Sequence, residues 1–401
     1  MTLCCPDKQD PFPSSCSCQK APAGSTADFP IIGDDASDCC SAQAPKPDSD
    51  HEKPGYKLWG FVEGFLPAPA GPVPLVHSEM NREDRRGTLF TRLGFGRDRY
   101  HIAPGLYGIG SPDAQSPVMV TANYKLSFDA LRFNLPGINA WILVVNTSGI
   151  NVWCAAGKGT FSAQEVAYRL KAARLADIVA HRRLILPQLS ATGVSARQVK
   201  KLCGFEVIWG PVHARHINEF LNKEMKATPE MRRVTFTFRE RLELIPVELN
   251  HLGKPTLYLV PALFLLSGVG HGIFSVGSAF SRGATALLAY LMAIAAGVVL
   301  APALLPWLPG KAFSVKGAVM GAAVSALLSA LFAGRLLFLE MLSLTIFVMA
   351  VSSYLAMNFT GSTPFTSPTG VEKEMRKAIP AQAICALAAV VLWVCAGFMG
   401  M

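Results

Sequence analysis

Hydrophobic and polar residues divide the chain into three regions with different patterns. Residues 1–55 are rich in Pro, Ser, Asp and Ala and show little apolar periodicity, which predicts a disordered tail. In residues 56–250, short apolar runs alternate with amphipathic stretches, which predicts an α/β domain. Residues 251–401 contain long apolar stretches, which predict an all-α transmembrane domain.

Five short apolar runs in the middle region are predicted strands. They are residues 117–122, 141–145, 184–189, 205–209 and 234–238. The charged stretch before them shows no clear period, whereas Ser162 and Glu165 form a capping-box pattern that opens a helix. Strands that alternate with helices indicate a Rossmann-like, mostly parallel sheet with connections on both faces. The carboxyl ends of parallel strands meet at one rim, where such sheets bind ligands.

Polar and small residues lie at or just after the ends of four of these predicted strands, which makes them candidates for lining a site at this rim. The candidates are Thr121, Asn123, Tyr124, Lys125, Thr147, Pro187, Gln188, Gly210 and Pro211. We expect them to lie close together, although they are far apart in the sequence.

The residues with the most specific chemistry lie between the second predicted strand and the next helix. They are Asn151, Val152, Trp153, Cys154, Ala155, Ala156, Gly157, Lys158, Gly159 and Thr160. Cys154 is expected on a short helical turn, where backbone N–H dipoles and the charge of Lys158 stabilise a thiolate. Ala155, Ala156 and Gly157 are small enough to let a flat, bulky group lie against the backbone.

Two other interpretations of this stretch exist. Cys154 is alternatively a buried structural cysteine, since free cysteines are among the most buried residue types. A nucleotide-binding P-loop is excluded, because Val152 stands where the motif needs its first glycine, and Gly159 follows Lys158 where the motif needs Ser or Thr.

Five apolar stretches in the last region are each long enough to cross the hydrocarbon core of a bilayer, about 30 Å. They are residues 257–276, 284–305, 317–333, 336–357 and 379–400. The loops after the second and fourth stretches carry Lys311, Lys316, Lys373, Arg376 and Lys377. The other two loops carry only Arg282 and Arg335. The positive-inside rule therefore predicts a multi-pass protein of the cytoplasmic (inner) membrane, with the middle domain in the cytoplasm and the C-terminus outside.

Polar residues within this region are candidates for function. Glu340 and His271 lie inside predicted spans, where ionisable groups are costly, and Glu340 could pair with Arg335. Residues 358–372 form a predicted loop with many Ser and Thr and two prolines. This loop is either a flexible hinge or a segment that folds back onto the cytoplasmic domain or a partner.

Composition narrows the class of protein. The chain is 51% hydrophobic and 16% charged, which is too apolar for an ordinary soluble protein. The formal charge of +9 fits cationic cytoplasmic loops, and no basic run interleaved with aromatics indicates nucleic-acid binding. Six of the ten cysteines lie in the first forty residues without zinc-site or cluster spacing. Adjacent thiols such as Cys39 and Cys40 could instead capture a soft metal.

Residues 151–161, NVWCAAGKGTF, resemble the signature of the membrane-bound corrinoid protein of microbial mercury methylation. The resemblance extends over roughly residues 56–401. A related motif occurs in the large subunit of the corrinoid iron–sulfur protein of acetyl-CoA synthesis, where the cysteine position is typically not a cobalt ligand. The resemblance implies a cobalamin cofactor with Cys154 as the lower axial ligand of its cobalt, and methyl transfer to Hg(II) to form methylmercury.

The histidines agree with this implied ligand. None of the eight sits in Asp-x-His-x-x-Gly, a pattern of a common cobalamin-binding module, so a corrinoid bound here would take its lower ligand elsewhere. His213 and His216 are expected at the surface. The resemblance further implies a small ferredoxin-like protein with two [4Fe-4S] clusters as electron donor. The methyl group would come from a methylated pterin or folate-type donor or its methyltransferase.

Two alternative functions stay open. One is a membrane-bound corrinoid methyl carrier of one-carbon or acetyl-CoA metabolism, against which Cys154 argues. The other is a metal-ion transporter with a cytoplasmic domain, which the few charges within the predicted spans disfavour.

Overall fold

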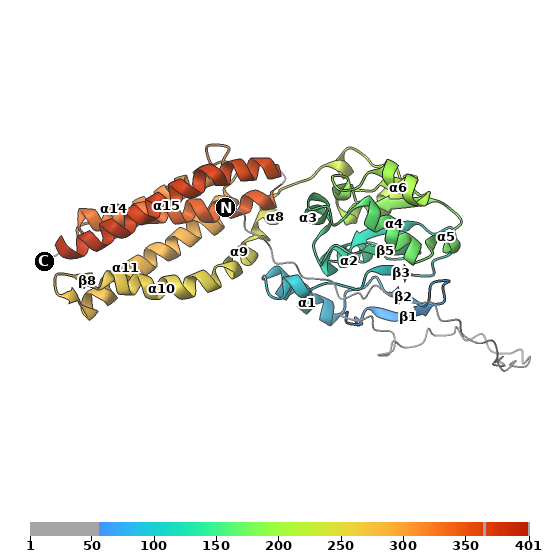
Figure 1. Ribbon diagram of the computed structural model, residues 1–401, viewed down its shortest axis with the longest axis horizontal. Coiled ribbons are helices and arrows are strands. Elements are labelled where there is room, and N and C mark those ends of the chain that lie inside the picture. Colours follow the sequence, from blue (N-terminus) through green and yellow to red (C-terminus); the bar gives the residue numbers. More distant parts are fainter. Residues whose placement is uncertain (1–55, 364–365, 400–401) are drawn as a thin grey trace, which may run out of the picture. The chain divides into compact units, whose positions relative to one another are not determined.

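The computed structural model describes residues 56–363 and 366–399 (Figure 1). The predicted disordered tail, residues 1–55, and the soft-metal hypothesis for Cys39 and Cys40 lie outside the described residues.

One sheet organises the α/β domain. Among the described residues its strands are β1 Val62–Leu66, β2 Val73–Val76, β3 Gly105–Ile109, β4 Val118–Ala122, β5 Ala140–Val145, β6 Arg183–Leu186 and β7 Glu206–Trp209, in the order β1-β2-β3-β5-β4-β6-β7. Strands β5, β4, β6 and β7 are parallel, and β3 joins β5 antiparallel. Strand β2 is parallel to β3, and β1 is antiparallel to β2. The prediction of a mostly parallel α/β sheet is confirmed.

Helices cover both faces of this sheet. They are α1 Arg82–Arg92, α2 Lys125–Arg132, α3 Val152–Gly157, α4 Ala163–Ala172, α5 Leu175–Ile178, α6 Ala196–Cys203 and α7 Ile217–Asn222. Short 3-10 turns are η2 Arg97–Arg99, η3 Gln188–Ser190, η4 Ala214–His216 and η5 Glu230–Arg232.

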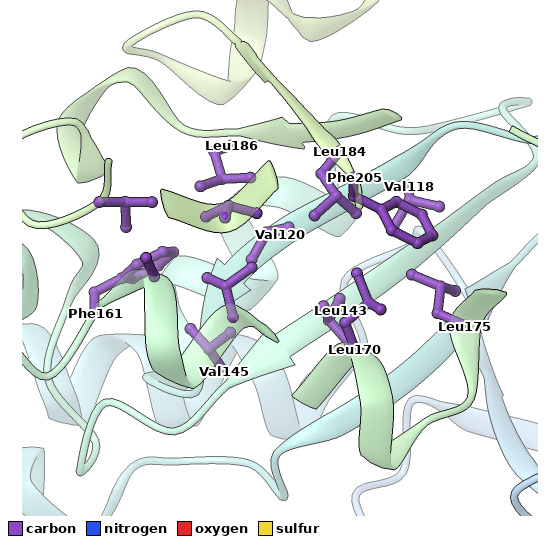
Figure 2. Packing of buried hydrophobic residues seen from close by; sticks show 14 of the residues in the cluster. Val118, Val120, Leu143, Val145, Phe161, Leu170, Leu175, Leu184, Leu186 and Phe205 are labelled. Carbon is purple, nitrogen blue, oxygen red and sulfur yellow. The ribbon is translucent and has the colours of Figure 1, made fainter. Parts of the chain in front are cut away.

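The buried strands contribute alternate residues to two hydrophobic cores, one on each face of the sheet, because successive side chains of a strand point to opposite faces. Val120 and Leu143 pack with residues of α3–α6, including Leu170, as Figure 2 shows. Met119 packs on the other face with residues of α2 and α7, including Phe128. A strand that is buried on both faces has a continuous apolar sequence. This is why β4 and β5 could be predicted from the sequence.

Two features of the middle region differ from the sequence analysis. Residues 234–238 were expected to form a strand, but Thr237 caps α8, Phe238–Leu242, and Val234 is 47% exposed. No strand or helix was predicted before residue 117, where the charged stretch shows no clear period, yet this part contains β1 to β3 and α1. Asn81 starts α1 with a capping box to Asp84, a signal that the sequence contained.

The C-terminal region is helical. Its helices are α9 Ile245–His251, α10 Gly253–Ser267, α11 Val276–Ile294, α12 Ala301–Ala303, α13 Phe313–Leu331, α14 Phe338–Asn358 and α15 Pro368–Met399, and a π-helical turn, Ala295–Leu300, joins α11 to α12. Within the described residues four helical segments are long and apolar enough to cross a membrane: Val276–Ala303, Phe313–Leu331, Phe338–Gly361 and Thr369–Met399.

The first of the five predicted spans differs from its expected extent. Helix α10 has 15 residues, about 22 Å of helix, and is followed by a hairpin of β8 Val269–Gly270 and β9 Ile273–Phe274. His271 lies in this exposed hairpin rather than in a helix. Ile245 of α9 nevertheless packs with Val298 and Leu305 at the far end of the α11–α12 segment. Helices α9 and α10 together therefore run alongside this segment, and an outside C-terminus stays a prediction.

Two polar features of the helical region also differ from expectation. Glu340 pairs with Arg282 (Nε to Oε1, 2.8 Å), not with Arg335. Asn358 ends α14, and the predicted loop 358–372 is largely taken up by a 3-10 turn, Phe359–Ser362, and by the start of α15. Thr360 is fully buried, and its hydroxyl donates to the Met357 carbonyl (2.5 Å).

Candidate functional site

The strand order reverses at β4, which defines where a ligand site should lie. The chain passes from β4 to β5 on one side and then to β6 and β7 on the other. Helix α2 packs on one face and α4 on the opposite face, so a crevice opens at the carboxyl ends of β4 and β6. A cavity of about 430 Å³ occupies this place.

The cavity walls come from four parts of the domain. Thr121 is the residue before the last of β4, Pro187 follows β6, and Gly210 and Pro211 follow β7. The remaining walls are Met119, Val120, Ile185, Leu186 and Leu189, with Ser127, Ala130, Leu131 and Ile217 of α2 and α7, Asn151, Val152 and Trp153 at α3, and Val212, His213 and Ala214. The lining is mostly apolar with a few polar groups, which is typical of small-molecule sites.

The Cys154 stretch forms a short capped helix, as predicted. Asn151 is the N-cap of α3, and its Oδ1 accepts a hydrogen bond from the backbone N–H of Cys154 (2.9 Å). Val152 and Trp153 line the cavity. Cys154 is exposed and lies one helical turn from Gly157 and Lys158, which are also exposed. The alternative of a buried structural cysteine is therefore excluded.

Ala155 and Ala156 were expected to let a flat group lie against the backbone, but they pack inside the protein instead. Ala155 is fully buried and Ala156 is 3% exposed, and both belong to the core beneath α3. Gly193 approaches them so closely that an added Cβ would lie 2.6 Å from the carbonyl oxygens of Ala156 and Phe161. The small side chains thus allow the loop after β6 to close against α3.

An open face remains on the other side of α3. A Cβ built on Gly157 or on Gly159 would meet no described atom within 4 Å. Thr160, where the motif ends, is half-buried and donates to the Ala155 carbonyl (3.3 Å). Cys154, Gly157 and Lys158 therefore present an exposed strip, hereafter the α3 strip, on which a flat group has room to lie.

The predicted rim residues after β4 do not line the cavity. Asn123 is buried, and its Oδ1 accepts hydrogen bonds from the backbone N–H of Thr147 (3.0 Å), the Thr147 hydroxyl (2.9 Å) and the N–H of Gly149 (3.0 Å). Tyr124 is also buried and forms a β-bridge with His101. These side chains tie the ends of β4 and β5 together.

Lys125 is held in a buried charge cluster, formed with Asp84, Asp129 and Arg132. Its Nζ donates to Asp84 Oδ1 (2.6 Å) and Asp129 Oδ2 (2.6 Å). Arg132 contacts the same two carboxylates, at 2.5 Å and 2.9 Å. Burial by itself would raise the pKa of Asp84. The hydrogen bond from Lys125 and the positive charges of Lys125 and Arg132 outweigh burial and hold this pKa below its usual value. The cluster is balanced, two cations with two anions. Lys125 is fully buried and its Nζ also lies against the rings of Trp59, Phe61 and Tyr100, so it does not reach the cavity.

Gln188 lies at the start of the turn that follows β6. Its Oε1 accepts a hydrogen bond from Arg232, so this side chain also has an internal partner.

His213 is a cavity residue that the sequence analysis missed, since it was expected at the surface and is half-buried. It lines the cavity directly after Gly210 and Pro211, and its Nε2 lies 3.3 Å from the Thr235 hydroxyl. Burial and the charge of Arg215 lower the pKa of His213. Its place just past the carboxyl end of β7 was the signal that could have found it.

A metal would find no ready-made ligand set in this domain. Within residues 56–363 and 366–399, no three His, Cys, Asp or Glu side chains come together as ligands. Cys154 is a single exposed donor, which suits a metal whose other ligands come from a bound cofactor.

Known proteins match this part of the chain. Residues 96–221 match the family described as CO dehydrogenase/acetyl-CoA synthase delta subunit, a stretch that includes β3 to β7. The acetyl-CoA decarbonylase/synthase complex subunit gamma of Methanopyrus kandleri is 33% identical over 130 residues, which cover 32% of this chain and 28% of the relative.

Two further relatives extend the picture. The subunit gamma of Archaeoglobus fulgidus is 31% identical over 129 residues, or 32% of this chain and 27% of the relative. The corrinoid/iron-sulfur protein large subunit of Moorella thermoacetica is 33% identical over 188 residues, 42% of each chain. The chain thus spans less than half the length of these relatives. The residues that build the cavity and the α3 strip lie within residues 96–221, the segment that matches the CO dehydrogenase/acetyl-CoA synthase delta subunit family.

Proposed function

We propose that the α/β domain binds a corrinoid and that the chain is a membrane-tethered, corrinoid-dependent methyl-transfer protein. The observation that carries this proposal is the cavity at the reversal of strand order, walled by Val152 and Trp153 of the Cys154 motif. It lies within the segment whose relatives include a corrinoid/iron-sulfur protein.

The residues present fit such a cofactor. The cavity, about 430 Å³, is within the usual size range of ligand sites but smaller than a whole corrinoid. Its apolar walls would enclose the nucleotide side chain of the cofactor, and the α3 strip would lie under the flat ring. Gly157 leaves space for a ring because it has no side chain and no neighbour above it.

A bound corrinoid supplies a cobalt atom that accepts and releases a methyl group. Cys154 Sγ would hold that cobalt, and the Asn151 cap fixes the turn that carries the thiol. Lys158 lies one helical turn away on the same exposed strip. Trp153 and Val152 exclude water from one side of the site. Electrons and the methyl group would come from a ferredoxin-like protein with two [4Fe-4S] clusters and from a methylated pterin or folate-type donor.

We propose Hg(II) as the methyl acceptor. A thiolate is a strong electron donor, so ligation by Cys154 would favour release of the methyl group toward a soft, thiophilic cation such as Hg(II). The exposed position of Cys154 supports this choice.

A methyl carrier of acetyl-CoA metabolism is the second candidate. The names of the relatives support it better than they support Hg(II), because several are subunits of acetyl-CoA decarbonylase/synthase complexes. In this case Cys154 would not be needed as a ligand, and the methyl group would pass to a partner of that metabolism.

One experiment tests both candidates. The full chain is purified in detergent and loaded with methylcobalamin, and its absorption spectrum is compared with those of Cys154→Ala and Cys203→Ala. Hg(II) is then added as the methyl acceptor. Cys203 is the matched control, a half-buried thiol on α6 whose Sγ donates to the Val199 carbonyl (3.1 Å).

We expect the parent and Cys203→Ala to share one spectrum and Cys154→Ala to show another, with methylmercury formed only by the first two. A chain that binds no corrinoid would disprove the corrinoid proposal. Identical spectra in all three, without methylmercury, would favour the acetyl-CoA candidate.

A further inference from the structure

A second and larger cavity lies in the helical region. Its volume is about 920 Å³, and its walls come from the beginning of α13, the second half of α14 and the first half of α15. Gln382 of α15 donates a hydrogen bond to the Ser353 hydroxyl of α14 (2.8 Å), which holds these two helices together at the cavity wall. All three helices are long and apolar enough to cross a membrane.

One end of this cavity is basic. Lys311, Lys373 and Lys377 line it, all three are exposed, and none forms an ion pair with a carboxylate of the described residues. The acidic residue of the lining, Glu374, is already engaged, because its Oε1 accepts a hydrogen bond from the Ser314 N–H in the first turn of α13 (2.7 Å). Three positive charges thus face one negative charge.

The other end is apolar. Ile346, Met349 and Ala350 of α14 and Ala318 of α13 line it, together with Cys385 of α15. Lys373 and Cys385 are twelve positions apart on α15, which corresponds to about 18 Å of helix. One leaflet of a hydrocarbon core of about 30 Å is about 15 Å deep, so the cavity reaches through roughly one leaflet.

We propose that this cavity binds one anionic phospholipid, with its phosphate among Lys311, Lys373 and Lys377 and an acyl chain along the apolar wall. Basic pockets between transmembrane helices are suited to acidic lipid headgroups. A polypeptide segment would not match a cavity that changes from basic to apolar over the depth of one leaflet. The proposal requires that the helices lie in a bilayer but does not depend on the corrinoid.

Lipid binding to the full chain tests the charge of the headgroup. The delipidated protein in mild detergent is mixed with phosphatidylglycerol or phosphatidylcholine of the same acyl chains, and bound lipid is counted by native mass spectrometry. We expect phosphatidylglycerol to be retained preferentially. Each of Lys373→Gln and Lys377→Gln should weaken its binding about fivefold, since a lysine near anionic lipid contributes about 1 kcal/mol.

Lys254→Gln is the matched control, because Lys254 is an exposed lysine of α10 outside the cavity. It should bind phosphatidylglycerol as the parent does. Equal retention of both lipids by the parent, or equal weakening by all three substitutions, would overturn the proposal. So would inorganic phosphate that binds as tightly as phosphatidylglycerol, because the acyl chains would then contribute nothing to binding.

A second measurement needs no variant. Cys385 lines the cavity, whereas Cys395, further along α15, is exposed outside it. Phosphatidylglycerol should slow the reaction of Cys385 with a maleimide, read by peptide mass spectrometry, and leave Cys395 unchanged. A dimer in detergent that protects Cys385 without lipid would show that a second copy fills the cavity and would contradict the proposal.

Discussion

Two polar segments follow neighbouring parallel strands of the same sheet, and they have opposite environments. Lys125 follows β4 and is fully buried, with two carboxylates around its ammonium group. Cys154 follows β5 and is exposed, and no described side chain contacts its sulfur through a hydrogen bond. Both lie at a strand-to-helix connection of the sheet, where the sequence places candidate ligand residues. A polar residue at the rim is therefore a candidate ligand only where its hydrogen-bonding capacity is not already used inside the protein.

The different burial of Lys125 and Cys154 implies that the first contributes to stability and the second to function. A buried cation with partners is costly to disturb, because removing it leaves charges unpaired in a medium of low polarity. An exposed thiol on a helix of six residues contributes little to folding but stays available to a ligand. The predictions below test this division, beginning with the largest effect.

Substitution of Cys154 should abolish function while the fold persists. Cys154→Ala removes the thiol but keeps a small side chain, so we expect methyl transfer to Hg(II) to fall to background with an unchanged far-UV circular dichroism spectrum. Cys154→Thr should still bind corrinoid but form no methylmercury, and Cys154→His should have low activity at best. Methylmercury formation at the parent rate by normally expressed Cys154→Ala would remove the proposed role of this residue.

Substitution of Lys125 should have the converse effect. Lys125→Met leaves Asp84 and Asp129 with Arg132 as their one remaining cation, and we expect a loss of about 3–5 kcal/mol in the free energy of unfolding. Denaturant titration of the full chain in detergent measures this loss. Lys158→Met on the α3 strip is the control and should stay within about 0.5 kcal/mol of the parent. Equal stability of both variants would show that the buried cluster does not differ from the surface.

Two glycines distinguish the packed side of α3 from its open side. Gly193→Ala places a Cβ against the Ala156 and Phe161 carbonyls and should cost about 1–3 kcal/mol of stability. Gly157→Ala meets no described atom and should change stability by less than about 1 kcal/mol. If the ring of a corrinoid lies on the α3 strip, Gly157→Ala should instead weaken cobalamin binding, measured by equilibrium dialysis. Unchanged binding would place the ring elsewhere.

The smallest effect concerns His213, a half-buried group between these extremes. Its pKa is lowered, so the unfolded chain binds the proton more tightly than the folded chain. Stability should therefore fall as the pH drops below the ordinary histidine value of about 6.5, and be unaffected by this group above it. His213→Gln should reduce the difference between unfolding midpoints at pH values below and above 6.5. His251→Gln, outside the cavity, is the control, and an identical reduction in both variants would contradict this assignment.

Much of the fold could be predicted because burial leaves a local trace in the sequence. Strands β4 to β6 are mostly buried and, like the half-buried edge strand β7, appear as short apolar runs. Helices α11 to α15 appear as long apolar stretches. Residues 234–238 were predicted as a strand because their alternating Val, Thr and Phe resemble a half-buried strand. No neighbouring strand covers Val234, and Thr237 instead begins helix α8 with a capping box. Strands β1, β2 and β3 were missed because Gly or Pro interrupts each of their short sequences, VEGFL, VPLV and GLYGI, and weakens the strand pattern.

The sequence by itself determined the α/β class, the apolar helices and the short capped turn that carries Cys154. These depend on periodicity, hydropathy and capping, which act between residues close in the chain. Only the tertiary structure shows which rim residues line the cavity and which are buried with hydrogen-bonding partners inside the protein. Lys125 is neutralised by Asp84, 41 positions away, and Ala156 is covered by the loop of Gly193. Such contacts depend on the path of the chain through space, and the spacing of residues along the sequence does not contain it.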